Sequence, residues 1–122
     1  QTVRDKMHCI RMSGREVFKL AVNAMLSAAR GALEKSGLAL GDINWVIPHQ
    51  ANMRIIEAIS DRLKLGMERF HVNLEHYGNT SAASIPVALA EAVRLGKVKR
   101  GDNILLVAFG GGLTWGSAVI EW

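Results

Sequence analysis

Three short segments of the chain contain residue types that could do chemistry. The first is Pro48–Asn52, where His49 follows an apolar run and precedes an expected helix. In open α/β sheets, sites lie at the carboxyl ends of strands, and a histidine there can donate to an anion or act as an acid or a base. A structural histidine bonded to nearby backbone is the alternative, and placement alone does not separate the two.

The other two segments are rich in glycine and small polar residues. Residues 77–81 read YGNTS and precede an expected helix, although asparagine and glycine are also common in ordinary turns. Residues 109–112 read FGGG after a buried strand, and the glycines allow backbone amides to approach a ligand closely. A dinucleotide-binding loop would need a helix next, whereas LTWGSAVI resembles a strand. A backbone oxyanion hole is the better functional interpretation, with a glycine hairpin as the structural alternative.

The other histidines and the cysteine indicate structural roles. His8, His71 and His76 show no metal-ligand spacing with Cys9 or with carboxylates, so no metal site is expected. Cys9 lies in an apolar run and is expected to be a core residue rather than a nucleophile. Because it is the only cysteine, no internal disulfide can form, which fits a cytoplasmic protein.

The composition is that of an ordinary soluble domain. Of the 122 residues, 49% are hydrophobic and 21% are charged, which is enough for one domain with a core. The longest apolar runs, such as residues 104–109, are too short to cross a bilayer. The net charge of +4 fits a mildly basic domain or a basic patch for an acidic partner, and nucleic acid is disfavoured because aromatic residues do not alternate with the basic ones. Because the chain begins with Gln1 and not methionine, we expect it to be cut from a longer protein.

The hydrophobic pattern predicts strands alternating with helices. The expected order is β-α-β-α-β-α-β-β, an α/β domain. Ser13 and Glu16 have capping-box spacing before the first helix, Asn52 can cap the second, and Gly37 and Gly66 are placed to end them. The expected strands are 7–12, 43–47, 70–74, 103–112 and 113–122, and the expected helices are about 14–35, 52–65 and 81–95.

The third expected helix is unusual because residues 81–93, SAASIPVALAEAV, are almost free of charge around the whole circumference. A helix that is apolar all round belongs in an interior. In a domain of this size with one sheet, helices normally cover the outside. We therefore expect a further layer of protein to cover this helix.

Taken in order, PHQAN, HYGNTSAAS and AFGGGLTWGSA resemble the carboxyl-terminal half of the β-ketoacyl-acyl-carrier-protein synthase III family, and GREVFKLAV near the start fits as well. The resemblance covers Gly14 to Trp122. It implies a thiolase-like α/β fold in which residues 1–122 are one half of a five-layer α-β-α-β-α architecture, the amino-terminal half being absent. The uncharged helix would then lie in the buried middle layer.

The resemblance also implies roles for individual residues. The family's catalytic set is Cys, His and Asn, of which the histidine matches His49 and the asparagine matches Asn79, while the cysteine belongs to the amino-terminal half. Relatives that elongate longer chains have a second histidine in place of Asn79. The backbone N–H of Gly111 resembles an oxyanion donor. Asn52 matches a position that contacts the pantetheine arm, and Phe109 is a further candidate for substrate binding.

The implied function is condensation of an acyl-coenzyme A, such as acetyl-CoA, with malonyl-acyl-carrier protein to initiate fatty-acid synthesis, with the thioester as substrate and no cofactor. Lys19 and Arg54 match basic positions where the acidic carrier protein docks, and Arg62 would join them; solvated surface charge is the alternative. The implied partners are the amino-terminal half, the carrier protein, acyl-CoA and a second copy in a homodimer, with neither nucleic acid nor membrane. A type III polyketide or quinolone-type synthase and a non-catalytic carrier-protein-binding module are the alternative functions.

Overall fold

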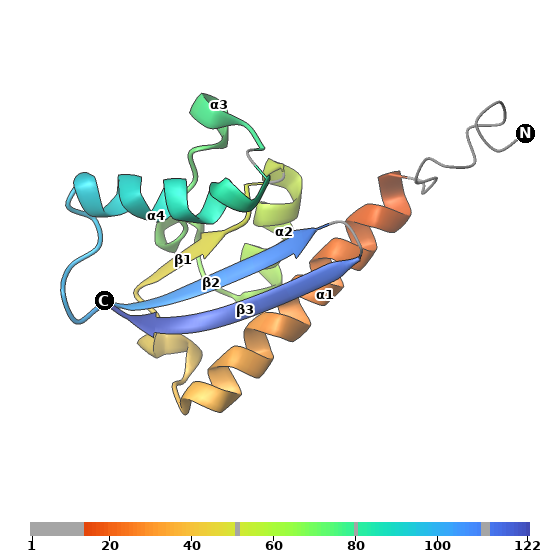
Figure 1. The fold of residues 1–122 in the computed structure, drawn as a ribbon. Helices are drawn as coiled ribbons and strands as arrows, with labels where there is room; N and C mark the ends of the chain where they lie inside the picture. The colour runs from red at the N-terminus through yellow and green to blue at the C-terminus, as the bar shows by residue number, and fades with distance from the viewer. Residues whose placement is uncertain (1–13, 51, 80, 111–112) are drawn as a thin grey trace, which may run out of the picture.

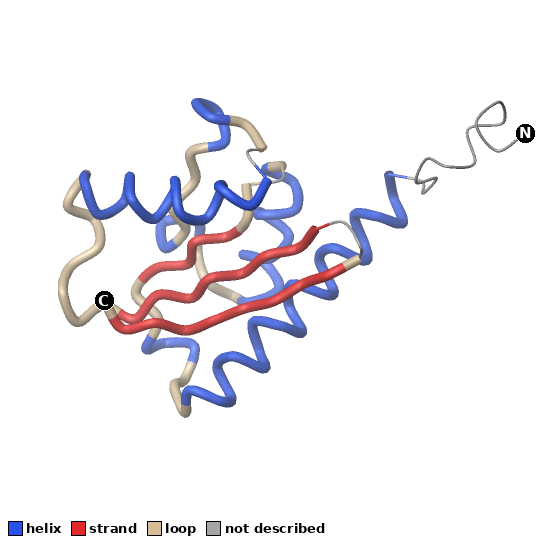
Figure 2. The backbone as a smooth tube through the Cα atoms, in the orientation of Figure 1, coloured by secondary structure: helices blue, strands red, loops and turns tan. Residues whose placement is uncertain are grey.

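A mixed sheet lies in the middle of the computed structural model (Figures 1 and 2). The strands, in sheet order, are β1 (Trp45–Pro48), β2 (Asn103–Gly110) and β3 (Thr114–Glu121). β1 runs parallel to β2, and β3 returns antiparallel beside β2. The β2–β3 hairpin is the arrangement predicted from the apolar run and the glycine-rich segment after it. The residues that the structure describes are 14–50, 52–79, 81–110 and 113–122.

Helices and short helical turns connect these strands. The helices of the described part are α1 (Gly14–Ser36), α2 (Met53–Leu63), α3 (Leu74–Tyr77) and α4 (Ser84–Arg94). Single 3-10 turns occur at η1 (Leu40–Asp42), η2 (Met67–Arg69) and η3 (Ser81–Ala83). None of the helices in these ranges is long and apolar enough to cross a membrane.

The two faces of the sheet bury separate apolar clusters because successive strand side chains point to opposite sides. Val46 and Val107 belong to the cluster that α1 and α2 cover. Ile47, the residue after Val46, and Ile104, three residues before Val107 on β2, pack instead with Ala88 of α4 on the other face. The described part is therefore layered as helix, sheet and helix, with α1 and α2 on one side and α4 on the other (Figure 1).

The ends of α1 and α2 follow local backbone chemistry. α1 is followed by Gly37, which adopts a positive φ of 73°, so the predicted stop is confirmed. Asn52 caps α2 as predicted, because its Oδ1 accepts a hydrogen bond from the backbone N of Ile55 at 3.0 Å. The predicted stop at Gly66 is wrong. α2 ends at Leu63, and the cap residue Lys64 takes the left-handed conformation with φ 58°.

The predicted strand at residues 70–74 is not formed as a strand. Phe70 makes only an isolated parallel bridge to Val46, and Leu74 already begins α3. The reason is local. The backbone N of His71 donates to the carbonyl of Val46, but the carbonyl of Asn73 then accepts from the backbone N of His76 and Tyr77, so the chain turns into α3 before a strand can extend.

Two other boundaries also differ from the prediction. The strand expected from residue 43 begins at Trp45, and the helix expected from Ser81 begins as a 3-10 turn before α4 starts at Ser84. The strand predicted at residues 7–12, with His8, Cys9 and the capping residue Ser13, lies outside the described residues. Of the β-α-β-α-β-α-β-β order, the described part contains the last two strands and one earlier strand.

α4 has one covered face and one apolar face that is accessible. Ala88 and Ala92 are fully buried against the sheet. Leu89 and Val93, which are partly buried against the same cluster, line a groove of about 430 Å³ with the exposed Pro86 and with Trp122. The sheet therefore covers only part of the apolar circumference of α4 within the described residues.

Candidate active site

The candidate site lies where β1 and β2 end side by side. The strands are parallel, with Pro48 opposite Val107, so their carboxyl ends meet at the same edge of the sheet. The backbone N of His49 donates to the carbonyl of Val107 at 2.7 Å and continues the ladder one residue beyond β1. The parallel pairing thus holds the backbone of His49 beside the end of β2, where Phe109 and Gly110 follow.

The imidazole of His49 is partly buried and makes a short contact with α4. Its Nδ1 lies 2.5 Å from Oγ of Ser84, the first residue of that helix. Burial removes water that would solvate the imidazolium, so the pKa of His49 lies below its ordinary value of 6.5. Burial therefore favours the neutral imidazole, which can donate from one ring nitrogen and accept at the other.

Asn79 reaches the same cavity from the loop after α3. α3 ends at Tyr77, the cap residue Gly78 turns the chain with a positive φ of 65°, and Asn79 follows directly. Asn79 is exposed and lines a cavity of about 530 Å³ together with His49. The structure therefore brings the two predicted catalytic side chains to one cavity, although they come from different loops.

The end of β2 and the start of β3 form the remaining wall of this cavity. Phe109 and Gly110 line it from β2, and Thr114 and Trp115 line it from β3. Phe109, predicted to bind substrate, is thus placed on the cavity wall. Gly111, predicted to offer its backbone N–H to an oxyanion, lies outside the described residues.

The side chain of Asn52 has a structural role at the start of α2. Its side-chain oxygen caps α2, and the residue is exposed. Asn52 does not line the cavity that His49 and Asn79 share. Its predicted contact with a pantetheine arm remains a prediction.

The three basic residues predicted for carrier-protein docking gather on α1 and α2. Lys19, Arg54 and Arg62 are all exposed. The guanidinium of Arg54 lies 5.6 Å from the ring centroid of Phe18, and Nη1 of Arg62 lies 3.4 Å from Oδ1 of Asn23. Both arginines of α2 therefore contact α1, the helix that also carries Lys19.

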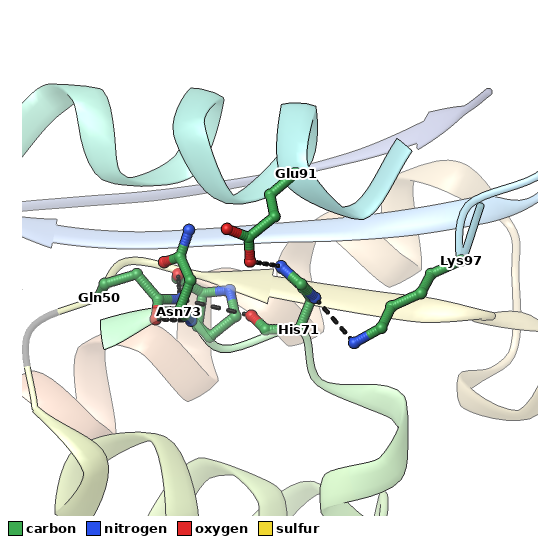
Figure 3. A network of polar contacts seen from close by, with 6 residues as sticks. Gln50, His71, Asn73, Glu91 and Lys97 are labelled. Atoms are coloured by element: carbon green, nitrogen blue, oxygen red, sulfur yellow. Dashed lines mark hydrogen bonds and ion pairs between the residues drawn. The ribbon is translucent and has the colours of Figure 1, made fainter. Parts of the chain in front are cut away.

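A buried polar network fastens the end of β1 to the start of α3 (Figure 3). Nε2 of the buried Gln50 donates to the carbonyls of Pro48 at 2.8 Å and His71 at 3.4 Å. Its Oε1 accepts from the backbone N of Asn73 at 3.1 Å. Because one side chain satisfies both segments, Gln50 fixes the separation between the loop after β1 and the segment that leads to α3.

His71 extends this network toward α4 (Figure 3). Nε2 of His71 lies 2.9 Å from Oε1 of Glu91, and Nδ1 lies 3.3 Å from Nζ of Lys97. Burial lowers the pKa of His71, although the hydrogen bond to Glu91 opposes this shift. A neutral ring that accepts from Lys97 and donates to Glu91 satisfies all three groups. This fits the structural role expected for His71 from the sequence.

Sequence reasoning did not identify Gln50 and Ser84. Gln50 lies inside the PHQAN motif, where His49 is the more prominent candidate. The pattern of residues 81–93 indicates for Ser84 only a place in an apolar helix. A signal for Ser84 exists, since a serine among SAASIPVALA is a polar side chain on a helix expected to be buried, and such a side chain needs a partner. Among the described residues, no group of three or more His, Cys, Asp or Glu side chains is arranged to hold a metal ion.

Comparison with known families decides how this site is classified. Residues 33–122 match the family described as 3-oxoacyl-[acyl-carrier-protein (ACP)] synthase III C terminal. The chain belongs to this synthase III family. It is similar to the β-ketoacyl-[acyl-carrier-protein] synthase III of Clostridioides difficile, with 56% identity over 122 residues, all of this chain and 37% of that protein. The Aquifex aeolicus synthase III is 53% identical over 118 residues, 97% of this chain and 38% of that protein.

Solved synthase III structures agree with this assignment. The Thermus thermophilus enzyme superposes with a TM-score of 0.88 at 56% identity, over 92% of this chain and 35% of that one. The Aquifex aeolicus enzyme superposes with a TM-score of 0.89 at 55% identity, over 93% and 37%. The α/β fold is thus that of the carboxyl-terminal part of a thiolase-like synthase III. The chain spans about 37% of the length of the curated relatives that it matches in full.

Proposed function

We propose that this chain is the carboxyl-terminal half of an acyltransferase that condenses an acyl-CoA, such as acetyl-CoA, with malonyl-acyl-carrier protein to initiate fatty-acid synthesis. The proposal rests on one observation above all. His49 and Asn79 line the same cavity at the carboxyl ends of β1 and β2. Membership of the synthase III family supports it.

The first half-reaction needs a cysteine from the amino-terminal half. Its thiolate attacks the acyl-CoA thioester carbonyl, the acyl group moves to the cysteine sulfur, and coenzyme A leaves as a thiol. The cavity beside Phe109 and Trp115 offers apolar walls close to polar groups, as sites for small ligands commonly do. In the second half-reaction, malonyl-carrier protein takes the place of coenzyme A.

His49 and Asn79 act in the second half-reaction. When the malonyl carboxylate leaves as CO₂, its bonding electrons pass to the thioester and form an enolate. The neutral imidazole of His49 and the amide of Asn79 donate hydrogen bonds to the enolate oxygen; one such donor is typically worth about 3–4 kcal/mol in the transition state. The enolate carbon then attacks the acyl-cysteine carbonyl and expels the thiolate, while the N–H of Gly111 stabilises the tetrahedral oxyanion.

The basic surface of Lys19, Arg54 and Arg62 receives the acidic carrier protein. Three exposed cations on adjoining helices raise the local potential and attract an acidic partner at long range. The surface includes the start of α2, where Asn52 lies two residues before Arg54. This placement supports a contact between Asn52 and the pantetheine arm as the arm passes from the docked carrier protein to the cavity.

The accessible face of α4 supports the proposed architecture. Leu89 and Val93 are partly buried, and Pro86 beside them is exposed. The amino-terminal half would cover this face and complete a five-layer α-β-α-β-α fold, with residues 1–122 as one of its two halves. The whole enzyme would act as a homodimer in the cytoplasm.

A second candidate function is the priming step of polyketide synthesis. The priming β-ketosynthase of the R1128 polyketide pathway superposes on 91% of this chain with a TM-score of 0.82 at 42% identity. The same two donors would serve that chemistry. The choice of starter acyl group, which the amino-terminal half would help to set, separates the two candidates.

The test supplies the intact protein with acetyl-CoA, longer acyl-CoA thioesters and malonyl-carrier protein, and measures β-ketoacyl-carrier protein. Product from acetyl-CoA supports initiation of fatty-acid synthesis, whereas preference for a longer or branched starter favours the polyketide alternative. Carrier-protein binding with neither CO₂ release nor product would contradict both and support a non-catalytic binding module.

A further inference from the structure

Ser84 lies where α4 meets the loop after β1, and its hydroxyl contacts two nitrogens of that loop. Oγ is 2.5 Å from Nδ1 of His49 and 3.3 Å from the backbone N of Gln50. Ser84 is buried, with 2% of its surface exposed, so water does not compete freely for these positions. The serine follows Asn79 by five residues, which places it on the segment that also leads from the second candidate donor.

The hydrogens around this hydroxyl can be assigned from the donors and acceptors present. A serine hydroxyl has one hydrogen to donate and two lone pairs to accept. The backbone N–H of Gln50 can only donate, so it occupies one lone pair of Oγ. The hydroxyl hydrogen is then directed at a second neighbour, and Nδ1 of His49 is the nearest acceptor at 2.5 Å.

This arrangement would set the tautomer of the ring. If Nδ1 accepts the hydroxyl hydrogen, a neutral imidazole carries its own hydrogen on Nε2. The opposite arrangement, with hydrogen on Nδ1, would require Oγ to accept two hydrogen bonds and to donate to a third group. The lowered pKa of His49 agrees with a neutral ring but does not by itself choose between the tautomers.

We propose that Ser84 is a positioning residue that holds His49 in the tautomer protonated at Nε2. With Nδ1 occupied by Ser84, Nε2–H is the ring donor that remains for the cavity that His49 lines. The catalytic meaning of this tautomer rests on the proposed function, because an enolate oxygen needs a donor. A ring without hydrogen on Nε2 would present a lone pair to the enolate oxygen and repel it.

Ser60 supplies a matched control. It is also a buried serine, and its Oγ donates to the carbonyl of Leu65 at 2.5 Å, within and just beyond α2. Ser60→Ala therefore removes a buried hydroxyl of the same kind without touching the ring of His49. Ser84→Thr keeps the hydroxyl and tests whether its chemistry, rather than the serine itself, is required.

The experiment records nitrogen NMR spectra of the intact protein labelled in its histidines, with the His49 signal identified by its loss in His49→Gln. We expect wild-type protein and Ser60→Ala to show hydrogen on Nε2 alone, Ser84→Ala to show a mixture of both tautomers, and Ser84→Thr to restore the single tautomer. Malonyl decarboxylation by Ser84→Ala should fall about tenfold in kcat, with little change in KM, because a neutral hydrogen bond no longer biases the ring.

Hydrogen on Nδ1 in wild-type protein, or an unchanged single tautomer in Ser84→Ala, would overturn the proposal. The spectra need no substrate, so they separate this inference from the proposed function. An intact protein with hydrogen on Nε2 that releases no CO₂ from malonyl-carrier protein would support the role of Ser84 and contradict the condensing activity.

Discussion

At the scale of single residues, the candidate site depends on two uncharged donors held by different means. His49 is kept neutral by burial and is held through backbone pairing with Val107 and its contact with Ser84. Asn79 cannot titrate and is placed by the turn at Gly78. A pair of neutral donors can stabilise an enolate without holding the malonyl carboxylate by a full charge, which would oppose its loss as CO₂.

Mild acid should destabilise the intact protein through His49 and His71. Burial lowers the pKa of both in the folded state, so below about 6.5 the unfolded chain binds more protons than the folded one. The contribution is therefore fully present above that pH and is lost as the pH falls through the lowered pKa values. We expect the urea midpoint of unfolding to fall between about pH 7.5 and 5, and His49→Gln to reduce the fall. An equal fall of the urea midpoint in His49→Gln and in wild-type protein would exclude a contribution from His49 to this pH dependence.

The residues of the site were predictable to different degrees. His49 and Asn79 were predicted from the resemblance of their motifs to a known family, because placement alone left His49 undecided and the residues around Asn79 are common in ordinary turns. Ser84 and Gln50 act through partners that are far away in sequence, such as the pair Ser84 and His49, 35 residues apart. Such a pair exists only because β1 and α4 pack together, and no local pattern in the sequence encodes that contact.

At the scale of the elements, prediction succeeded where short-range chemistry decides. The cap at Asn52 depends on neighbouring backbone, and the β2–β3 hairpin depends on an apolar run and a glycine-rich segment. Prediction failed at residues 70–74. The sequence pattern there predicts a strand, but the backbone enters a hydrogen-bonded helical turn at Asn73. The end of α2 was missed because Lys64 adopts a conformation more usual for glycine.

Charge reversal on α1 and α2 should weaken carrier-protein docking. We expect Lys19→Glu and Arg54→Glu each to raise the KM for malonyl-carrier protein about three- to tenfold at low salt, since each reverses an exposed charge. The use of acetyl-CoA should be spared, and the effect should shrink as salt screens the charges. Lys99→Glu is the control, because it changes the net charge equally in the exposed turn before β2.

Comparing the KM for malonyl-carrier protein across these variants tests whether the basic residues of α1 and α2 bind the carrier protein. A KM that does not depend on salt and is the same in wild type, Lys19→Glu, Arg54→Glu and Lys99→Glu would show that Lys19 and Arg54 are solvated charges. Arg54→Gln helps to separate charge from packing, because it removes the cation over the ring of Phe18 without introducing an acid.

At the scale of the whole molecule, α4 links the site to the overall architecture. Its first residue contacts His49, its inner face packs on the sheet, and one side of it lines a mostly apolar groove with Trp122. A helix with this composition is stable inside a protein and costly at a surface. The sequence indicated this from the missing charges alone, but only the structure shows which part of the circumference the sheet already covers.

Residues 1–122 alone should self-associate and should not condense substrates. An uncovered apolar patch of roughly several hundred Å² is typical of an interface. At about 25 cal/mol per Å², its burial is worth several kcal/mol, comparable with the net stability of a domain. Cys9, the only thiol, is expected to be structural, so no acyl group should be held. Sedimentation and thermal unfolding of the isolated chain measure the first claim, and Leu89→Gln should reduce the association. A monodisperse monomer that melts cooperatively, or turnover through acylated Cys9, would contradict these expectations.

The central claim, that His49 and Asn79 serve the decarboxylation step, is tested most directly by comparing the two half-reactions in the intact protein. Acyl transfer is followed as label moving from acetyl-CoA to the protein, and decarboxylation as CO₂ released from malonyl-carrier protein. His49→Ala and Asn79→Ala should each slow CO₂ release by about a hundred- to a thousandfold, because each removes a donor to the enolate. Labelling of the cysteine should change far less. Equal loss of both half-reactions, or CO₂ release at the wild-type rate, would contradict the assignment.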